Sequence, residues 1–127
     1  MGYPTGSGSE RLYGGAIHNL ANVDTTFRFE GLHPATGTSS YVVPANHIVT
    51  ILSVNVTDTN SLLKYFQMVG YIGSTAMNFV YQERIPSKQT FVWNEKIVLH
   101  PTDKILVVGE AGAGFDVYYT YVEQDWS

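Results

Sequence analysis

Apolar and polar side chains alternate along most of this chain with a period of two residues. The clearest case is residues 41–59, which read YVVPANHIVTILSVNVTDT and predict a short strand, a Pro-Ala-Asn break and a longer strand. In the longer strand, one face carries Ile48, Thr50, Leu52, Val54 and Val56, and the other carries Val49, Ile51, Ser53, Asn55 and Thr57. Because alternate side chains of a β-strand point to opposite faces, the pattern predicts one apolar face. The second face is apolar only near its start, so we expect that end to be covered on both sides.

The same alternation predicts further strands on both sides of this one. They are expected at residues 23–30, 62–72, 77–85, 90–100, 104–110 and 115–124. The segment 62–72 also has a weak helical spacing, but its Tyr, Phe, Val and Ile content favours a strand. In 90–100 the alternation loses its phase near Asn94, which indicates a β-bulge. The segment 104–110 is apolar on both faces and is expected at the centre of a sheet.

Turn residues separate these strands. The loop 31–40 contains Pro34 and two glycines, and Asp58 and Asp103 lie in turns where carboxylates accept hydrogen bonds from the backbone. About eight short strands with turn signals roughly every 8–12 residues are typical of an antiparallel β-sandwich or jelly roll. The sequence therefore predicts an all-β domain over residues 23–127.

Residues 1–22 have no sustained period and are rich in Gly and Ser, which is typical of an extended, flexible arm. Apolar side chains interrupt this composition at positions that a simple linker would not need. We expect these side chains to bind a partner: Tyr3, Leu12, Tyr13, Ile17 and Leu20.

Charge and composition exclude several classes of function. Only 14% of the 127 residues are charged, against about 25% in an average protein, and the net charge is −4. A nucleic-acid partner is not expected, because no basic stripe could face a phosphate backbone. No apolar run approaches the ~20 residues of a membrane span, and no secretory signal is recognisable. Nine Tyr and six Phe with few charges resemble the core of an interface, although aromatic residues are also common in strands.

No catalytic or metal-binding constellation is recognisable. The four histidines, His18, His33, His47 and His100, show no ligand spacing, and the chain has no Cys. Glu83 and Glu95 could form a carboxylate pair of glycosidase type, but ordinary surface charge explains them as well. We expect a non-enzymatic protein without a cofactor, a metal or catalytic residues.

The most distinctive surface candidate is an aromatic cluster near the C-terminus, made of Tyr118, Tyr119, Tyr121 and Trp126. On a strand, Tyr119 and Tyr121 share one face and Tyr118 takes the other. One of these faces should be core. The other would expose an aromatic ring that packs in a subunit interface or stacks on a sugar; the remaining alternative is a core whose hydroxyls reach the rim.

Three segments, 41–59, 97–107 and 115–123, resemble small β-sandwich virion proteins of tailed bacteriophages. The shared pattern is a strand ending in Val-Pro-Ala, an apolar strand with a polar turn, and a closing strand that carries Tyr and Glu. Several such proteins are capsid decoration (cement) proteins, which form trimers on the shell. Residues 1–22 are an addition to this pattern, which concerns the sandwich domain alone.

This resemblance implies a structural protein on the outer surface of a phage head, made in the host cytoplasm. It implies a homotrimer that binds the major capsid protein, with the arm stapling neighbouring capsid subunits and the aromatic cluster forming the subunit interface. A tail or neck component of the same fold is the first alternative. A carbohydrate-binding module is the alternative from another class.

Overall fold

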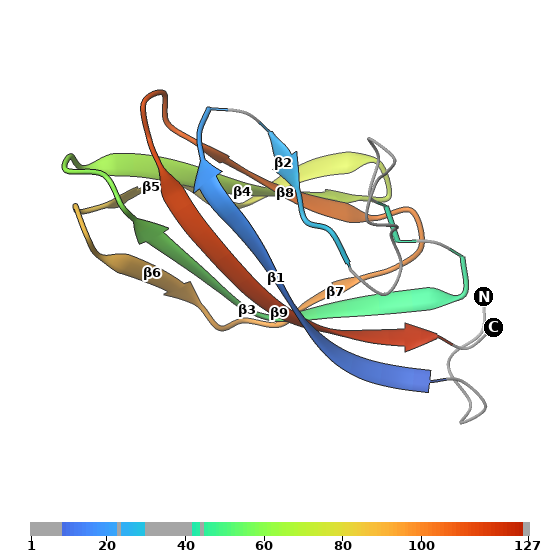
Figure 1. The fold of residues 1–127 in the computed structure, drawn as a ribbon. Helices are drawn as coiled ribbons and strands as arrows, with labels where there is room; N and C mark the ends of the chain where they lie inside the picture. Colours follow the sequence, from blue (N-terminus) through green and yellow to red (C-terminus); the bar gives the residue numbers. More distant parts are fainter. Residues whose placement is uncertain (1–8, 23, 30–41, 44, 126–127) are drawn as a thin grey trace.

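The computed structural model describes residues 9–22, 24–29, 42–43 and 45–125 (Figure 1). Within these residues the chain forms nine β-strands and no helix. The strands are β1 (Ser9–Leu20), β2 (Thr25–Thr26), β3 (His47–Asp58), β4 (Lys64–Ile72), β5 (Thr75–Ile85), β6 (Thr90–Trp93), β7 (Ile97–Leu99), β8 (Lys104–Gly109) and β9 (Phe115–Asp125). The prediction of an all-β fold is confirmed.

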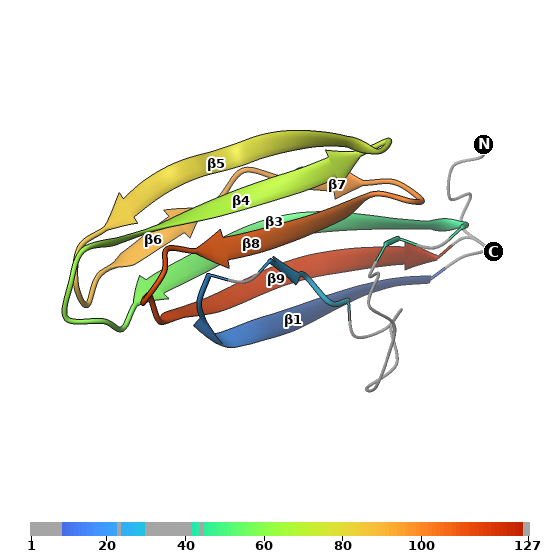
Figure 2. The same cartoon turned by 90° about the horizontal axis from the view of Figure 1, so that it is seen from above.

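The strands form two antiparallel sheets that lie face to face (Figure 2). Sheet A has the order β1-β9-β3-β6, and β7 also pairs with β3. Sheet B has the order β2-β8-β4-β5. The predicted antiparallel sandwich is therefore confirmed, and β8 lies between β2 and β4, as its two apolar faces indicated.

The strand order is that of a jelly roll. Early strands pair with late ones in nested fashion: β1 with β9, β2 with β8, β3 with β6 and β7, and β4 with β5. The resulting long hairpin is rolled up, because β9 also pairs with β3 and β8 also pairs with β4. Counting β6 and β7 as one interrupted strand gives the eight strands of this architecture. The interruption at residues 94–96 lies where the sequence predicted a bulge.

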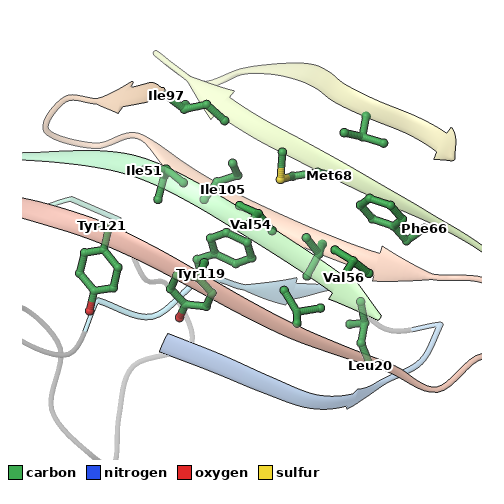
Figure 3. Close-up of a cluster of buried hydrophobic side chains, with 14 of the residues drawn as sticks. Leu20, Ile51, Val54, Val56, Phe66, Met68, Ile97, Ile105, Tyr119 and Tyr121 are labelled. Atoms are coloured by element: carbon green, nitrogen blue, oxygen red, sulfur yellow. The ribbon is translucent and has the colours of Figure 1, made fainter. Parts of the chain in front are cut away.

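The core lies between the two sheets and is made of side chains from both (Figure 3). Its largest fully buried side chains include Tyr119, Tyr121, Phe27, Phe29, Phe66, Phe115, Ile51 and Met68. Buried aromatic rings of this size contribute a large share of the apolar area removed from water. Of the predicted strand 23–30, the described residues 24–29 form a strand at Thr25–Thr26 alone, and Phe27 and Phe29 are buried in the core.

A β-bulge in β3 corrects the predicted faces of the longest strand. Ile51 pairs with Tyr121 and Ser53 with Thr120, so Leu52 is an extra residue in β3. The core-facing set therefore changes phase, from Val49 and Ile51 before the bulge to Val54 and Val56 after it. The expectation that Ile48 through Val56 share one apolar face was wrong, because a strict period of two cannot accommodate an inserted residue.

The prediction that residues 1–22 form a flexible arm was wrong for Ser9–Leu20. This segment is the edge strand β1, which pairs with β9 from Ser9 to Leu20. Its glycines make room for aromatic rings: a Cβ at Gly14 would lie 2.4 Å from the Tyr118 hydroxyl, and one at Gly15 would lie 2.4 Å from Tyr119 Cζ. Glycine in a strand interior often marks such a close approach. Residues 1–8, including Tyr3, lie outside the described residues.

Two buried acids stabilise turns, as the sequence predicted. The Asp58 carboxylate accepts a hydrogen bond from the backbone N–H of Asn60 at 2.8 Å. The Asp103 carboxylate accepts from the backbone N–H groups of Gly73 at 2.9 Å and His100 at 3.0 Å. Asp103 therefore joins the β4–β5 turn to the β7–β8 turn at one end of the sandwich.

Tyr119 joins the two sheets through its ring and its hydroxyl. Its ring is stacked on Phe27, with centroids 4.1 Å apart and an interplanar angle of 4°. The hydroxyl donates to the carbonyl oxygen of Arg28 at 2.6 Å and accepts from the Arg28 backbone N–H at 2.9 Å. A strand of sheet A is thereby fixed to the segment that follows β2 of sheet B.

Adding one methyl group at Gly15 should destabilise the fold. In Gly15→Ala, the new Cβ meets the buried Tyr119 ring, which has no space to move, so we expect the free energy of unfolding in urea to fall by about 1–3 kcal/mol. Gly14→Ala is the matched control, because Tyr118 is half exposed and can turn into solvent. Its effect should stay within about 0.5 kcal/mol. Equal losses in the two variants would contradict this account.

Removing the Tyr119 hydroxyl should also be costly. Tyr119→Phe keeps the stacked ring but leaves the Arg28 backbone groups without this partner, so we expect a loss of about 1–3 kcal/mol in the free energy of unfolding. Tyr118→Phe, on the exposed side of the same strand, is the control and should change stability by less than about 0.5 kcal/mol. A Tyr119→Phe protein as stable as the parent would refute a structural role for the hydroxyl.

Candidate interaction surface

The outer face of sheet A is a broad surface with few charges. Residues directly opposite each other on paired strands point to the same face, so the register defines rows across the sheet. One row is formed by Leu12, Val122, Thr50 and Val98. A second row is formed by Ala16, Tyr118, Asn55 and Val92. Gly14, Thr120 and Ser53 lie between them, and the two hydroxyls are hydrogen bonded at 2.7 Å.

None of these eleven positions carries a charged side chain. Four large apolar or aromatic side chains on this face are well exposed: Leu12 at 69%, Val92 at 51%, Tyr118 at 50% and Val98 at 46%. Scattered apolar side chains are normal on a protein surface, but a face without charges is characteristic of the centre of an interface. The outer face of sheet A is therefore the strongest candidate for binding another macromolecule.

The outer face of sheet B is different. Two of its tyrosines lie next to cationic side chains: Lys104 Nζ lies 4.9 Å from the centroid of the Tyr71 ring, and Arg84 Cζ lies 6.0 Å from that of Tyr65. Such cation–π contacts place charge over the aromatic faces and keep them compatible with water. The two outer faces are thus chemically distinct, and only that of sheet A lacks charges over its centre.

A small hollow of about 280 Å³ lies at one end of the sheet A face. It is lined by Ala16, Ile17, His18, Asn55, Thr57, Asp116, Val117 and Tyr118. His18 Nδ1 lies 2.8 Å from Asp116 Oδ1, and the backbone N–H of Asn19 donates to the same oxygen at 3.2 Å. These contacts hold the irregular end of β1, where the register shifts between Ile17 and Leu20, against β9.

The structure separates the aromatic residues of the predicted subunit interface. Tyr118 lies on the outer face, whereas Tyr119 and Tyr121 are buried in the core. The sequence placed Tyr118 on the opposite side from the other two, and this alternation is confirmed. As interface residues, however, Tyr119 and Tyr121 have no accessible surface in this chain to offer a partner. Trp126 lies outside the described residues.

The residues of the predicted arm also fall into different environments. Leu12 is exposed on the outer face of sheet A, but Leu20 is 2% exposed and belongs to the core. Tyr13 and Ile17 pack partly against the core, and the Tyr13 ring lies 5.6 Å from that of Tyr121. Four residues that line the face or its hollow were missed in the sequence: Val92, Val98, Asn55 and Asp116. The alternation in 90–100 already indicated that side chains of this segment point to two opposite faces. Which of the two faces carries the exposed valines is decided by the pairing of β6 and β7 with β3.

The described His, Asp and Glu side chains are dispersed over the sandwich. The described residues contain no group of three or more His, Asp or Glu side chains that could hold a metal ion. His47 and His100 each lie near one carboxylate, with Nε2 to Asp125 Oδ2 at 3.6 Å and Nδ1 to Asp103 Oδ2 at 4.0 Å. Glu83 and Glu95 are both exposed, and lie on β5 of sheet B and between β6 and β7 of sheet A. In the described part of the chain, no helix could span a membrane.

The fold thus defines an antiparallel jelly roll with one outer face whose centre is uncharged, and solved structures with similar folds come from diverse proteins. No protein-family model matches the chain. No curated protein matches it either. A subunit of Bacillus endospore appendages, described as a novel family of disulfide-linked pili, has a TM-score of 0.52 at 12% identity, covering 100% of this chain and 97% of that one.

A structure of infectious bursal disease virus, Gx strain, has a TM-score of 0.48 at 14% identity and covers 95% of this chain. This chain spans about a third of that viral chain, with 34% covered. The globular domain of a zebrafish complement 1qA protein has a TM-score of 0.39 at 10% identity, covering 85% of this chain and 94% of that one. At such identities the likeness concerns the fold alone.

The outer face should tolerate charge without loss of folding. In Val98→Lys, the replaced side chain is half exposed, so we expect the free energy of unfolding to change by less than about 0.5 kcal/mol. Leu99→Ala, one residue further on β7 and fully buried, should lose about 2–5 kcal/mol. Urea denaturation of both variants tests the orientation of β7, and a reversed order of the two effects would contradict it.

Proposed function

We propose that this protein is a non-enzymatic structural component of a bacteriophage virion, namely a decoration (cement) protein on the outer surface of the capsid. The observation that carries the proposal is the uncharged centre of the outer face of sheet A, which exposes Leu12, Val92, Val98 and Tyr118. The resemblance of three sequence segments to small virion proteins of tailed phages supports the choice of this class. A tail or neck component of the same fold is the alternative.

The occupant proposed for this face is a second copy of the chain, within a homotrimer. In a threefold trimer each copy packs this face against a different surface of the next copy, and an uncharged face can do so without repulsion between like charges, even though the chain as a whole has a net charge of −4. Tyr118 is the aromatic residue of this interface, because large aromatic side chains are enriched at the centres of contacts. The buried Tyr119 and Tyr121 support Tyr118 from below and make no contact with the partner.

The size of the face suggests that a single contact is weak. With strands about 4.8 Å apart and a rise of about 3.4 Å per residue, the uncharged area of four strands and five residues measures roughly 20 Å by 17 Å, or about 340 Å². A standard stable interface buries about 800 Å² on each partner. A protein with a smaller face binds firmly when several copies attach to one scaffold, since linked contacts raise the effective concentration. The major capsid protein is the scaffold proposed here.

The pilus subunit has a fold similar to that of this chain but differs from it chemically. Those pili are described as disulfide-linked, whereas this chain contains no Cys. In the proposed assembly the contacts are therefore not disulfide bonds, and we propose that they are non-covalent. Such contacts stabilise a shell when they bind its assembled form in preference to its loosened form.

The oligomeric state in solution is the first test. We expect light scattering to show a mass that rises with concentration from 14.1 kDa towards three times that value. Val98→Lys and Leu12→Lys should keep the protein monomeric, because each places a charge that would be buried in the contact. The matched control is Tyr81→Lys, which changes an exposed aromatic residue on β5 of sheet B.

Capsid binding is the second measurement of the same test. The parent protein should cosediment with phage heads and raise their thermal stability, whereas the two sheet A variants should do so less than Tyr81→Lys. A parent protein that is monomeric at all concentrations and does not bind heads would refute the proposal. Loss of binding in Tyr81→Lys alone would place the contact on the other sheet.

A further inference from the structure

We propose that the hollow lined by Tyr118, Asn55, Thr57 and Asp116 binds one neutral sugar ring of a glycan. This inference goes beyond the proposed structural function and does not depend on it. The hollow lies at one end of the sheet A face, where it shares Ala16, Asn55 and Tyr118 with the second row and includes no residue of the row that carries Leu12 and Val98. A ligand of this size could therefore occupy the hollow without covering the rest of the face.

The lining combines the two kinds of group that a sugar ring requires. One face of a pyranose ring presents apolar C–H groups, for which the half-exposed ring of Tyr118 offers an aromatic platform. The hydroxyl groups of the sugar both donate and accept hydrogen bonds. The Asn55 amide and the Thr57 hydroxyl can do the same, and the Asp116 carboxylate accepts. A few placed polar groups in a partly apolar hollow are the usual composition of a small-molecule site.

The Asp116 carboxylate makes two contacts in the absence of a ligand. Its Oδ1 is held by His18 Nδ1 at 2.8 Å and by the backbone N–H of Asn19 at 3.2 Å. Both contacts use Oδ1, so Oδ2 can accept hydrogen bonds from a ligand. Asn19 has a positive φ of 60°, which turns its backbone at the irregular end of β1. A carboxylate held in this way loses little conformational freedom on binding a hydroxyl group.

Tyr118 and Thr57 are also positioned by neighbouring residues. The Tyr118 ring leans over Gly14, where any Cβ would meet its hydroxyl and Cζ at 2.4 and 3.0 Å. The Thr57 hydroxyl lies 2.8 Å from that of Thr90 on β6. The Gly14 gap on β1 therefore sets the direction of the aromatic platform, and the neighbouring strand β6 holds a polar group at its border.

Size and charge narrow the class of ligand. A volume of about 280 Å³ lies just below the range of roughly 300–1,000 Å³ that is typical of sites for drug-sized ligands. It therefore suits a single ring better than an oligosaccharide. Asp116 and the net charge of −4 disfavour sialic acids, uronic acids and sugar phosphates. Neutral hexoses and N-acetylhexosamines are the sugars that fit this chemistry.

The test is NMR titration of the ¹⁵N-labelled full chain with glucose, galactose, mannose and N-acetylglucosamine. We expect at least one sugar to shift the amide signals of Asn55, Asp116 and Val117 in a saturable manner. Tyr118→Ala and Asp116→Asn should each lower the binding affinity for that sugar by at least about tenfold. Asn55→Ala provides a second polar variant that leaves the His18–Asp116–Asn19 contacts intact, so a local change in β1 cannot imitate the result.

Two further variants separate positioning from contact and this site from the proposed interface. Gly14→Ala should weaken sugar binding by displacing the Tyr118 ring, while the free energy of unfolding stays close to that of the parent. Val98→Lys should retain full sugar affinity while it changes the oligomeric mass. Conversely, Asp116→Asn should lose sugar binding and keep the oligomeric mass. The sugar site and the proposed subunit interface can therefore be tested independently of each other.

Two results would overturn the sugar site. The first is the absence of saturable shifts with all four sugars at concentrations on the order of 100 mM, well above the millimolar range of weak binding. The second is binding that Tyr118→Ala, Asp116→Asn and Asn55→Ala all leave unchanged, since the sugar would then lie elsewhere. Binding that all three variants weaken, and that Val98→Lys preserves, would confirm it.

Discussion

The packing of Tyr119 between the two sheets is the constraint on which the rest of the structure depends. Its ring is stacked on Phe27, and its hydroxyl satisfies both backbone polar groups of Arg28. A buried hydroxyl that makes two good hydrogen bonds avoids the penalty of desolvation and fixes one register. The ring fits only because Gly15 on β1 has no side chain. The edge strand, the centre of sheet A and the segment after β2 are thus fixed together by one residue.

The orientation of Tyr119 determines the outer surface. Because side chains alternate along β9, an inward Tyr119 places Tyr118 on the outer face, above Gly14. Two adjacent glycines therefore receive two adjacent tyrosines, one ring on each side of the sheet. The Gly15–Tyr119 pair on the inner side stabilises the core. The Gly14–Tyr118 pair on the outer side positions the aromatic ring of the candidate interaction surface. A change that shifts the register of β1 by one residue would exchange the two environments and disrupt both.

The sequence was sufficient for features that depend on local pattern. Alternation and turn residues predicted the all-β class, the central position of β8, the interruption near Asn94 and the buried turn carboxylates. It was insufficient where a distant partner decides the outcome. The glycine-rich composition of residues 1–22 indicated flexibility. This prediction was wrong for β1 because the rings of Tyr118 and Tyr119, which fill the space at Gly14 and Gly15, come from a strand about 100 residues away. The Leu52 bulge was missed for the same reason, since it is defined only by pairing with β9. The hollow combines β1, β3 and β9, which the sequence keeps far apart.

The outer face of sheet A combines exposed apolar side chains with short polar ones. Its exposed valines and leucine are separated by short polar side chains, and the hydroxyls of Ser53 and Thr120 are already hydrogen bonded to each other. These groups interrupt the apolar surface without adding charge, so no large continuous patch forms. Contacts through such a face should be reversible, because each contributes little apolar area. This balance is the one required of a subunit that stays soluble until a scaffold presents many binding positions at once, at which point weak contacts combine into firm attachment.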